Sequence, residues 1–325
     1  MAANSPAKLA QKQNQTAAEQ LSAMRSEKPS ENFGQLRSFV VATILLALCF
    51  SVPLYHLLWF AAGSALYSHI LLVPFISSYL IWLRRRHLPP SSEPVRQLVA
   101  FAWIAGFVVL VGYWVAAGSV LTLTEEDSLA LTTLAFLLFF YGICCLFLGA
   151  DTLRAIVFPL VFLVFMSPFP TFVREGIELM SQHSSAATAD AMFRLSGMPI
   201  FREGLGFQLP GIRLYVAQEC SGIHSSLVLF LTSLVAGHLF LRTPWKRLLL
   251  VLVVIPLGVL RNGFRIFVIG QLCVHIGPQM LYSAIHRQGG PLFFALSLAL
   301  FFLLLIVLRK SDRVAAEMKP EQLGD

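Results

Sequence analysis

The chain has 325 residues, of which 57% are hydrophobic and only 13% are charged. With a mean hydropathy of +0.73, it has too little polar surface to cover a soluble globule, so it is predicted to be an integral membrane protein. The net charge of +7 does not indicate nucleic-acid binding, because the basic residues lie between apolar runs rather than in one patch interleaved with stacking aromatic residues.

The chain opens with a polar stretch rich in Ala, Gln, Ser and Lys. Residues 1–36 are predicted to form a disordered cytoplasmic tail, because such a composition buries too little apolar surface to fold. They contain no short apolar segment with a small-residue cleavage site, so no removable signal peptide is expected. A transmembrane domain over residues 37–310 and a cytoplasmic C-terminal tail over residues 311–325 are expected to follow.

Apolar runs that approach the length of a membrane span predict an all-α polytopic membrane protein with about eight transmembrane helices. These runs lie near 38–55, 66–83, 98–118, 128–149, 154–170, 222–241, 247–269 and 290–308. No internal sequence repeat of the kind found in many transporters is present.

Lysine and arginine residues orient these spans. The segments near 84–96, 242–247 and 309–319 are basic, whereas the loops near 56–65 and 119–127 contain no Lys or Arg. Short cytoplasmic loops keep an excess of basic residues. Both termini are therefore predicted to be cytoplasmic, and the segments near 171–221 and 270–289 are predicted to be external.

The largest external segment, 171–219, changes its pattern halfway. Its first part mixes apolar and charged residues, which suits a small helix at the outer membrane interface. In its second part, Ile212, Leu214 and Val216 alternate with Arg213 and Tyr215 behind Gly and Pro residues. This alternation favours a short β-hairpin, and a plain loop is the alternative.

Three residues able to take part in covalent chemistry lie at one predicted membrane depth. Cys220 comes just before the sixth span, where a helix N-terminus and a nearby cation would both favour the thiolate. Arg265 lies near the outer end of the seventh span, and His286 lies just before the last one. Each residue also has a simpler interpretation. Arg265 would then be a side chain that extends to the lipid headgroups, His286 an ordinary loop residue, and Cys220 a disulfide partner of Cys273.

Three neighbours of these residues are secondary candidates. His224 follows Cys220 by four positions, so it would share a helix face with it and compete with His286 as a proton carrier. Arg261 lies one turn deeper in the membrane than Arg265, where a charge is harder to explain by snorkelling. Asn262 lies on the same helix face as Arg265.

In this region the chain resembles the exosortase/archaeosortase family of multi-pass membrane cysteine transpeptidases. The resemblance covers roughly half of the chain, from about Pro159 to the end of the last span. Its motifs are the segments 168–170, 196–199, 216–223 and 262–266, followed by His286 ahead of a final apolar helix. His224 departs from the family pattern, which more often has Arg or Asn there, and this leaves the subfamily open.

The resemblance implies a nucleophile at Cys220, an essential arginine at Arg265 and an essential histidine at His286, with no metal and no cofactor. It also implies an enzyme of the bacterial inner membrane with an external site, associated with exopolysaccharide production. Its partners would be exported proteins that carry a C-terminal PEP-CTERM-like signal of motif, helix and basic tail, together with membrane lipid and an unidentified acceptor nucleophile. The thiolate would form a thioester with the precursor. Arg265 would stabilise the oxyanion and His286 would transfer protons.

Two other classes of protein compete with this interpretation. A non-enzymatic transporter or scaffold would have the same apolar composition, but it predicts a polar path across the bilayer, and the inner halves of the spans contain few charges. A rhomboid-type serine protease would need a Gly-x-Ser-Gly nucleophile within a span. Here Ser221 and Gly222 are present, the first Gly is missing, and the segment lies at the membrane rim.

Overall fold

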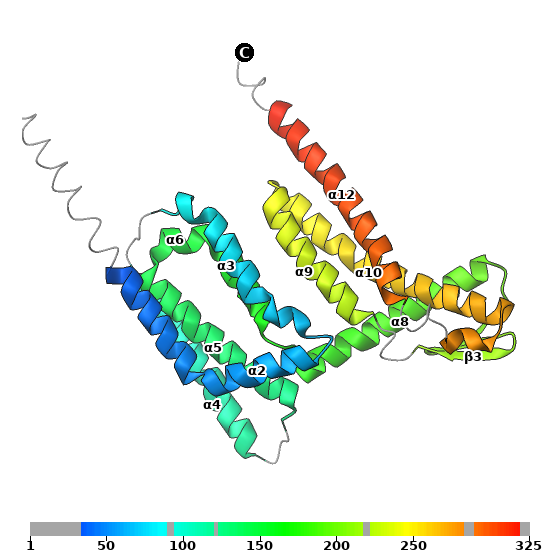
Figure 1. Cartoon of the computed structure of the whole chain (residues 1–325), viewed down its shortest axis with the longest axis horizontal. Helices are drawn as coiled ribbons and strands as arrows, with labels where there is room; N and C mark the ends of the chain where they lie inside the picture. The colour runs from blue at the N-terminus through cyan, green and yellow to red at the C-terminus, as the bar shows by residue number, and fades with distance from the viewer. Residues whose placement is uncertain (1–33, 90–93, 120–122, 217–221, 283–288, 319–325) are drawn as a thin grey trace, which may run out of the picture. The chain divides into compact units, whose positions relative to one another are not determined.

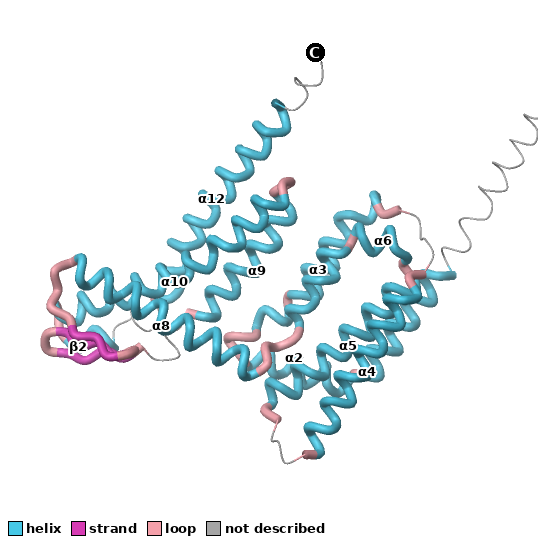
Figure 2. The backbone as a smooth tube through the Cα atoms, turned by 180° about the vertical axis from the view of Figure 1, so that it is seen from behind, coloured by secondary structure: helices cyan, strands magenta, loops and turns pink. Residues whose placement is uncertain are grey.

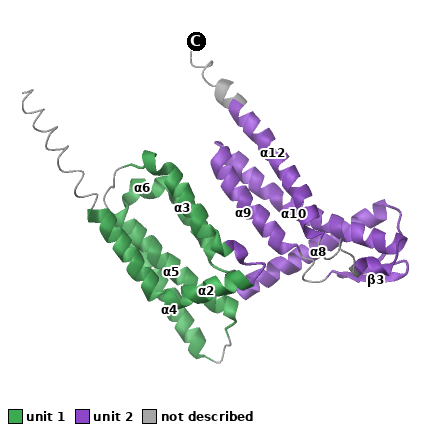
Figure 3. Ribbon diagram, viewed as in Figure 1, with its two compact units in different colours: residues 1–63, 70–168 green, residues 64–69, 169–325 purple. Residues whose placement is uncertain are grey.

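A computed structural model gives the fold of the chain (Figure 1) and describes residues 34–89, 94–119, 123–216, 222–282 and 289–318. The chain divides into two compact units (Figure 3). Residues 1–63 and 70–168 form the first unit, and residues 64–69 and 169–325 form the second. The predicted tail over residues 1–36 lies almost entirely outside the described residues.

The first unit is helical. A helix over Gly34–Cys49 is followed by α2 (Ser51–Gly63), α3 (Val73–Arg84), α4 (Arg96–Gly118), α5 (Glu125–Phe147), α6 (Gly149–Ala155) and α7 (Val157–Phe162), with the 3-10 turns η2 (Arg85–His87) and η3 (Leu163–Met166). A further 3-10 turn, η1 (Ser68–Leu71), crosses the boundary between the two units. Helices α4 and α5 pack closely, because Gly142 leaves room for the Trp103 ring and Gly106 for the Phe139 ring. Thr124 caps α5 by accepting a hydrogen bond from the Asp127 amide, and the acidic first turn complements the helix dipole.

The second unit contains the predicted external segment and the last three long helices. Its elements are α8 (Thr171–Leu195), the strands β1 (Phe201–Glu203), β2 (Gly206–Leu209) and β3 (Ile212–Tyr215), then α9 (Ile223–Phe240), α10 (Pro244–His275), η5 (Pro278–Tyr282) and α12 (Gly290–Met318). Helix α10 is central to this unit, because α8, α9 and α12 all contact it.

The segment predicted to be external has the helix-then-strand order that its sequence predicts. The three strands form an antiparallel meander (Figure 2) in which Phe207 pairs with Leu214. As the alternation predicts, Leu214 is buried while Arg213 and Tyr215 are exposed. The strand β1 is an addition to the expected hairpin. The buried face of the sheet packs against α8 and the C-terminal part of α10 through Phe193, Phe207, Ile266 and Phe267.

Five helices within the described residues are long and apolar enough to cross a membrane, or up to seven if each of two bent pairs counts as one span. The protein is therefore a mostly helical polytopic membrane protein, and the expected number of eight spans is not confirmed. The difference arises where helices break. The helices Gly34–Cys49 and α2 meet at 73°, and α6 meets the α7 segment at 70°. The predicted span near 66–83 consists of η1 and the 12-residue α3.

Candidate functional site

The site is built where the beginning of α9 meets the middle of α10. Gly222 is the N-cap of α9 and has φ +69°, in the left-handed region that favours glycine. A Cβ at this position would lie 3.1 Å from Nη2 of Arg261 and 3.2 Å from the Asn262 carboxamide. The backbone of α9 therefore approaches two polar side chains of α10 more closely than a larger residue at position 222 would allow.

Arg261 ties the start of α9 to α10. Its Nη2 donates hydrogen bonds to the backbone carbonyl of Gly222 and to the hydroxyl of Ser226, both at 3.1 Å. The side chain is buried, with 7% of its surface exposed. Its Nη1 is also buried, and it has no hydrogen-bond partner among the described residues. A guanidinium this deep in an apolar helix belongs to a polar site rather than to a headgroup contact.

Arg265 and Asn262 extend this polar group along α10. Asn262 is 3% exposed, and Arg265 is half-buried one turn beyond Arg261. These three residues singled out from the sequence occupy one stretch of α10, and the structure places Arg261 and Asn262 of that stretch beside Gly222 at the beginning of α9.

Close helix contacts fix the position of this stretch. A Cβ on Gly263 would lie 2.6 Å from Cβ of Thr188 in α8, and a Cβ on Gly258 would lie 2.7 Å from Oγ of Ser226 in α9. Small residues at helix contacts let backbones approach closely in membrane proteins. The glycine within the motif 262–266 therefore serves packing, and it sets the orientation in which α10 presents Arg261 and Arg265.

His69 is a candidate site residue that the sequence analysis did not single out. It belongs to the second unit, is 7% exposed, and lies close enough to His224 in the first turn of α9 for the charged forms of the two rings to repel each other. Its Nδ1 lies 3.1 Å from the Leu66 carbonyl oxygen, and its ring lies beside that of buried Tyr67. The signal available in the sequence was a histidine inside a predicted apolar span, where an ionisable residue is unusual.

Two of the three predicted catalytic residues, Cys220 and His286, lie outside the described residues. Cys220 is two positions before Gly222, so the described part of the chain resumes almost directly after it. Cys273 is buried in α10 and forms no disulfide with another described cysteine. No group of three or more His, Cys, Asp or Glu residues in the described ranges could hold a metal ion.

The donors at this site suit a carbonyl oxygen or an oxyanion. A guanidinium is planar, permanently charged and able to direct two parallel N–H groups at one oxygen-bearing group. Donors held by packing in a site of low dielectric constant stabilise developing negative charge strongly, because they do not have to reorganise. The beginning of α9 adds backbone N–H groups and the positive end of a helix dipole.

In a comparison with known protein families, residues 59–303 match the model of the transmembrane exosortases. The match covers more than half of the chain and includes α9, α10 and the polar stretch described above. No curated protein and no solved structure matches the chain.

Proposed function

Because the chain belongs to the transmembrane exosortase family, we propose that it is a cysteine transpeptidase that uses Cys220 to cleave the C-terminal sorting signals of exported proteins. The family in general consists of membrane proteases or transpeptidases that act on exported proteins with such signals. The observation that supports the proposal is the contact between Gly222 and Arg261. It places the helix that begins beside Cys220 against the arginine-bearing stretch of α10.

The proposed reaction has two steps. The Cys220 thiolate attacks the scissile carbonyl carbon of the precursor, and the resulting oxyanion is stabilised by the Arg265 guanidinium. When the C–N bond breaks, the His286 imidazolium gives its proton to the leaving amine, and a thioester remains on Cys220. An acceptor nucleophile then attacks the thioester, loses its proton to the neutral imidazole, and releases the thiolate.

Arg261 has a positioning role in this proposal. Its Nη2 already donates to the Gly222 carbonyl and to Ser226, so it holds the start of α9 at a fixed distance from α10. Arg265, one turn away and half-buried, faces the precursor in this proposal. His224 and His69 lie beside the start of α9 and would shape the polar surroundings of the thiolate.

The proposed location is the bacterial inner membrane, with both termini in the cytoplasm and the site on the external side. The basic segments near 84–96, 242–247 and 309–319 support this orientation through the positive-inside rule. A precursor that is still anchored by its own C-terminal helix would present its cleavage motif at the same membrane surface.

Mass spectrometry of a candidate precursor tests the proposed function. The precursor is co-expressed with the parent enzyme, with Cys220→Ala, and with Cys144→Ala as a control that removes a buried thiol from the other unit. The parent and the control are expected to cleave the precursor and attach an acceptor at one position, and Cys220→Ala to leave it at full length. Normal processing by Cys220→Ala would refute Cys220 as the nucleophile, and a precursor left at full length by the parent would favour a transporter or scaffold instead.

A further inference from the structure

A second polar feature of the second unit lies far along α9 and α10 from the candidate site. A cavity of about 630 Å³ lies there. It is surrounded by the end of α9, the first turns of α10 and the end of the described part of α12. Four arginines line it, namely Arg242, Arg247, Arg309 and Arg313, together with Asp312 and His238. The volume falls in the range of a site for a small ligand or a headgroup.

The single carboxylate of this cavity is already neutralised. Asp312 accepts hydrogen bonds from Nζ of Lys246 at 2.9 Å, from the Thr243 hydroxyl at 2.6 Å and from the Arg242 amide at 2.9 Å. It is 7% exposed. Asp312 therefore fixes the turn between α9 and α10 onto α12, and its charge is matched by a lysine rather than by the arginines of the cavity.

The four arginines have no acidic partner among the described residues. Nε of Arg247 donates to the Leu241 carbonyl at 2.8 Å, and the Arg309 guanidinium lies 5.4 Å from the centre of the Phe240 ring. Arg242 and Arg313 are exposed. Several like charges gathered around one cavity repel each other unless an anion joins them, and phosphate oxygens match the planar guanidinium well.

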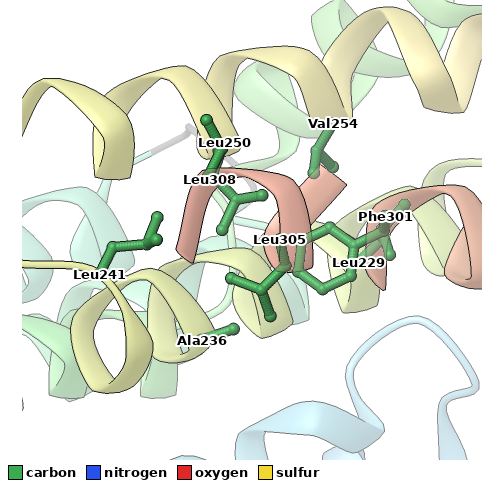
Figure 4. Packing of buried hydrophobic residues seen from close by; sticks show 8 residues of the cluster. All are labelled: Leu229, Ala236, Leu241, Leu250, Val254, Phe301, Leu305 and Leu308. Carbon is green, nitrogen blue, oxygen red and sulfur yellow. The ribbon is translucent and has the colours of Figure 1, made fainter. Parts of the chain in front are cut away.

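A packed frame holds these helix ends together. One buried hydrophobic cluster joins α9, α10 and α12 (Figure 4). It consists of Leu229 and Ala236 of α9, Leu241 just after α9, Leu250 and Val254 of α10, and Phe301, Leu305 and Leu308 of α12. Leu241 and Leu308 are direct chain neighbours of the cavity residues Arg242 and Arg309. The basic side chains are therefore attached to a rigid core and not to a free tail.

The surroundings of the cavity favour a lipid over a free ion. Phe240, Trp245 and Leu248 are exposed on the α9–α10 side, and Ile306 and Val307 are exposed on α12. These residues belong to or adjoin helices that are apolar enough to span a membrane. An apolar surface next to a basic cavity suits a ligand with acyl chains and a phosphate, and a tryptophan at such a level is typical of the membrane interface.

We propose that this cavity binds the phosphate group of an anionic phospholipid, with the acyl chains lying along α10 and α12. Basic pockets between transmembrane helices on the cytoplasmic side are a recurrent form of lipid-headgroup recognition. The site is separate from the polar stretch around Arg261, and the proposal does not depend on the transpeptidase chemistry.

Native mass spectrometry of the full-length protein in detergent tests the site. The probe is phosphatidylglycerol, with phosphatidylcholine as the zwitterionic reference. The double variant Arg309→Gln/Arg313→Gln is expected to bind phosphatidylglycerol roughly 25-fold more weakly than the parent, since each basic residue near an anionic lipid is worth roughly fivefold in affinity. Its phosphatidylcholine binding should not change.

A matched control removes the same charge from outside the cavity. Lys310→Gln/Arg154→Gln changes an exposed residue on the same turn of α12 and an exposed residue of the other unit, and it should bind phosphatidylglycerol as the parent does. An equal loss of phosphatidylglycerol affinity in both double variants would overturn the proposed site. In a separate experiment, the melting temperature of the parent in phosphatidylcholine is measured with and without inorganic phosphate. If it stabilises the parent as much as phosphatidylglycerol does, the lipid assignment fails.

Discussion

Arg261 and Arg265 lie one turn apart on α10, but their surroundings give them different tasks. Arg261 is buried and uses Nη2 to hold Gly222 and Ser226. Arg265 is half-buried at the next turn. In the proposed mechanism, Arg261 supports the backbone next to the proposed nucleophile Cys220 and acts on the reaction through that backbone, whereas Arg265 meets the precursor.

Lysine substitutions separate the two roles. Arg265→Lys keeps the charge but loses the planar pair of donors, so the rate of precursor cleavage is expected to fall by about 100- to 1,000-fold, as on removal of an oxyanion donor. Arg261→Lys is expected to lower the melting temperature and to reduce cleavage less. Full cleavage by Arg265→Lys together with none by Arg261→Lys would exchange the two assignments.

For single residues, the sequence shows which side chains are unusual in a span, but it does not show which other residues they contact. Arg261, Asn262 and Arg265 stand out because polar residues are unusual in an apolar span, and all three lie in α10. The contact of Arg261 with the Gly222 carbonyl was not predictable, since it depends on how closely α9 and α10 approach. His69 was missed because its neighbour His224 lies 155 positions later in the chain.

Helix α10 is the element that organises the second unit. It was predicted as a span near 247–269, and it runs from Pro244 to His275. In the extra turns after residue 269, Gly270 lies against Phe193 of α8 and Leu209 of β2, and Val274 packs against the same cluster, so the helix continues beyond the length that a bilayer alone requires. Periodicity and hydropathy indicate where a helix is apolar, but they do not reveal a protein partner beyond the membrane.

The contact between α8 and α10 tolerates no side chain at Gly263. In Gly263→Ala, the new Cβ would lie 2.6 Å from Cβ of Thr188, so α8 has to move, at a cost of roughly 1–3 kcal/mol. We expect a lower melting temperature and slower precursor cleavage. Gly112→Ala in α4 is the control, because nothing lies within 4 Å of its added Cβ and it should not destabilise the protein. Equal melting temperatures for Gly263→Ala and the parent would contradict this packing.

The Asp312 contacts join α12 to the turn between α9 and α10. Asp312→Asn removes the charge that Lys246, Thr243 and the Arg242 amide all face, and the expected loss of stability is about 2 kcal/mol. The control is Asp151→Asn, which breaks an exposed ion pair with Arg154 at 3.6 Å and should cost less than about 1 kcal/mol. Chemical denaturation in one detergent compares the two, and equal losses would show that Asp312 is not a structural anchor.

For the whole molecule, composition was enough to predict a helical membrane protein, and the structure agrees. The number of spans was harder to predict. A run of apolar residues does not show whether the helix is continuous, and two of the expected spans fall in helix pairs bent by 73° and 70°. The small sheet was foreseeable from the alternation around Leu214, but its first strand, β1, has only three residues and gives little periodicity.

The proposed orientation makes a prediction about the entire chain. Fusions of alkaline phosphatase, which is active only outside the cytoplasm, are expected to be inactive after residue 325 and active after Ser119, in the loop that lacks Lys and Arg. Active fusions at the C-terminus would reverse the orientation and place the Arg309 region outside.

The central claim is that Cys220 forms a thioester with the precursor. Its most direct test is peptide mass mapping of the parent enzyme after co-expression with a precursor. The expected result is a hydroxylamine-labile acyl adduct on Cys220 and none on Cys49, Cys144, Cys145 or Cys273. Cleavage of the precursor at an unchanged rate by Cys220→Ala, with no adduct on any cysteine of the parent, would contradict the claim.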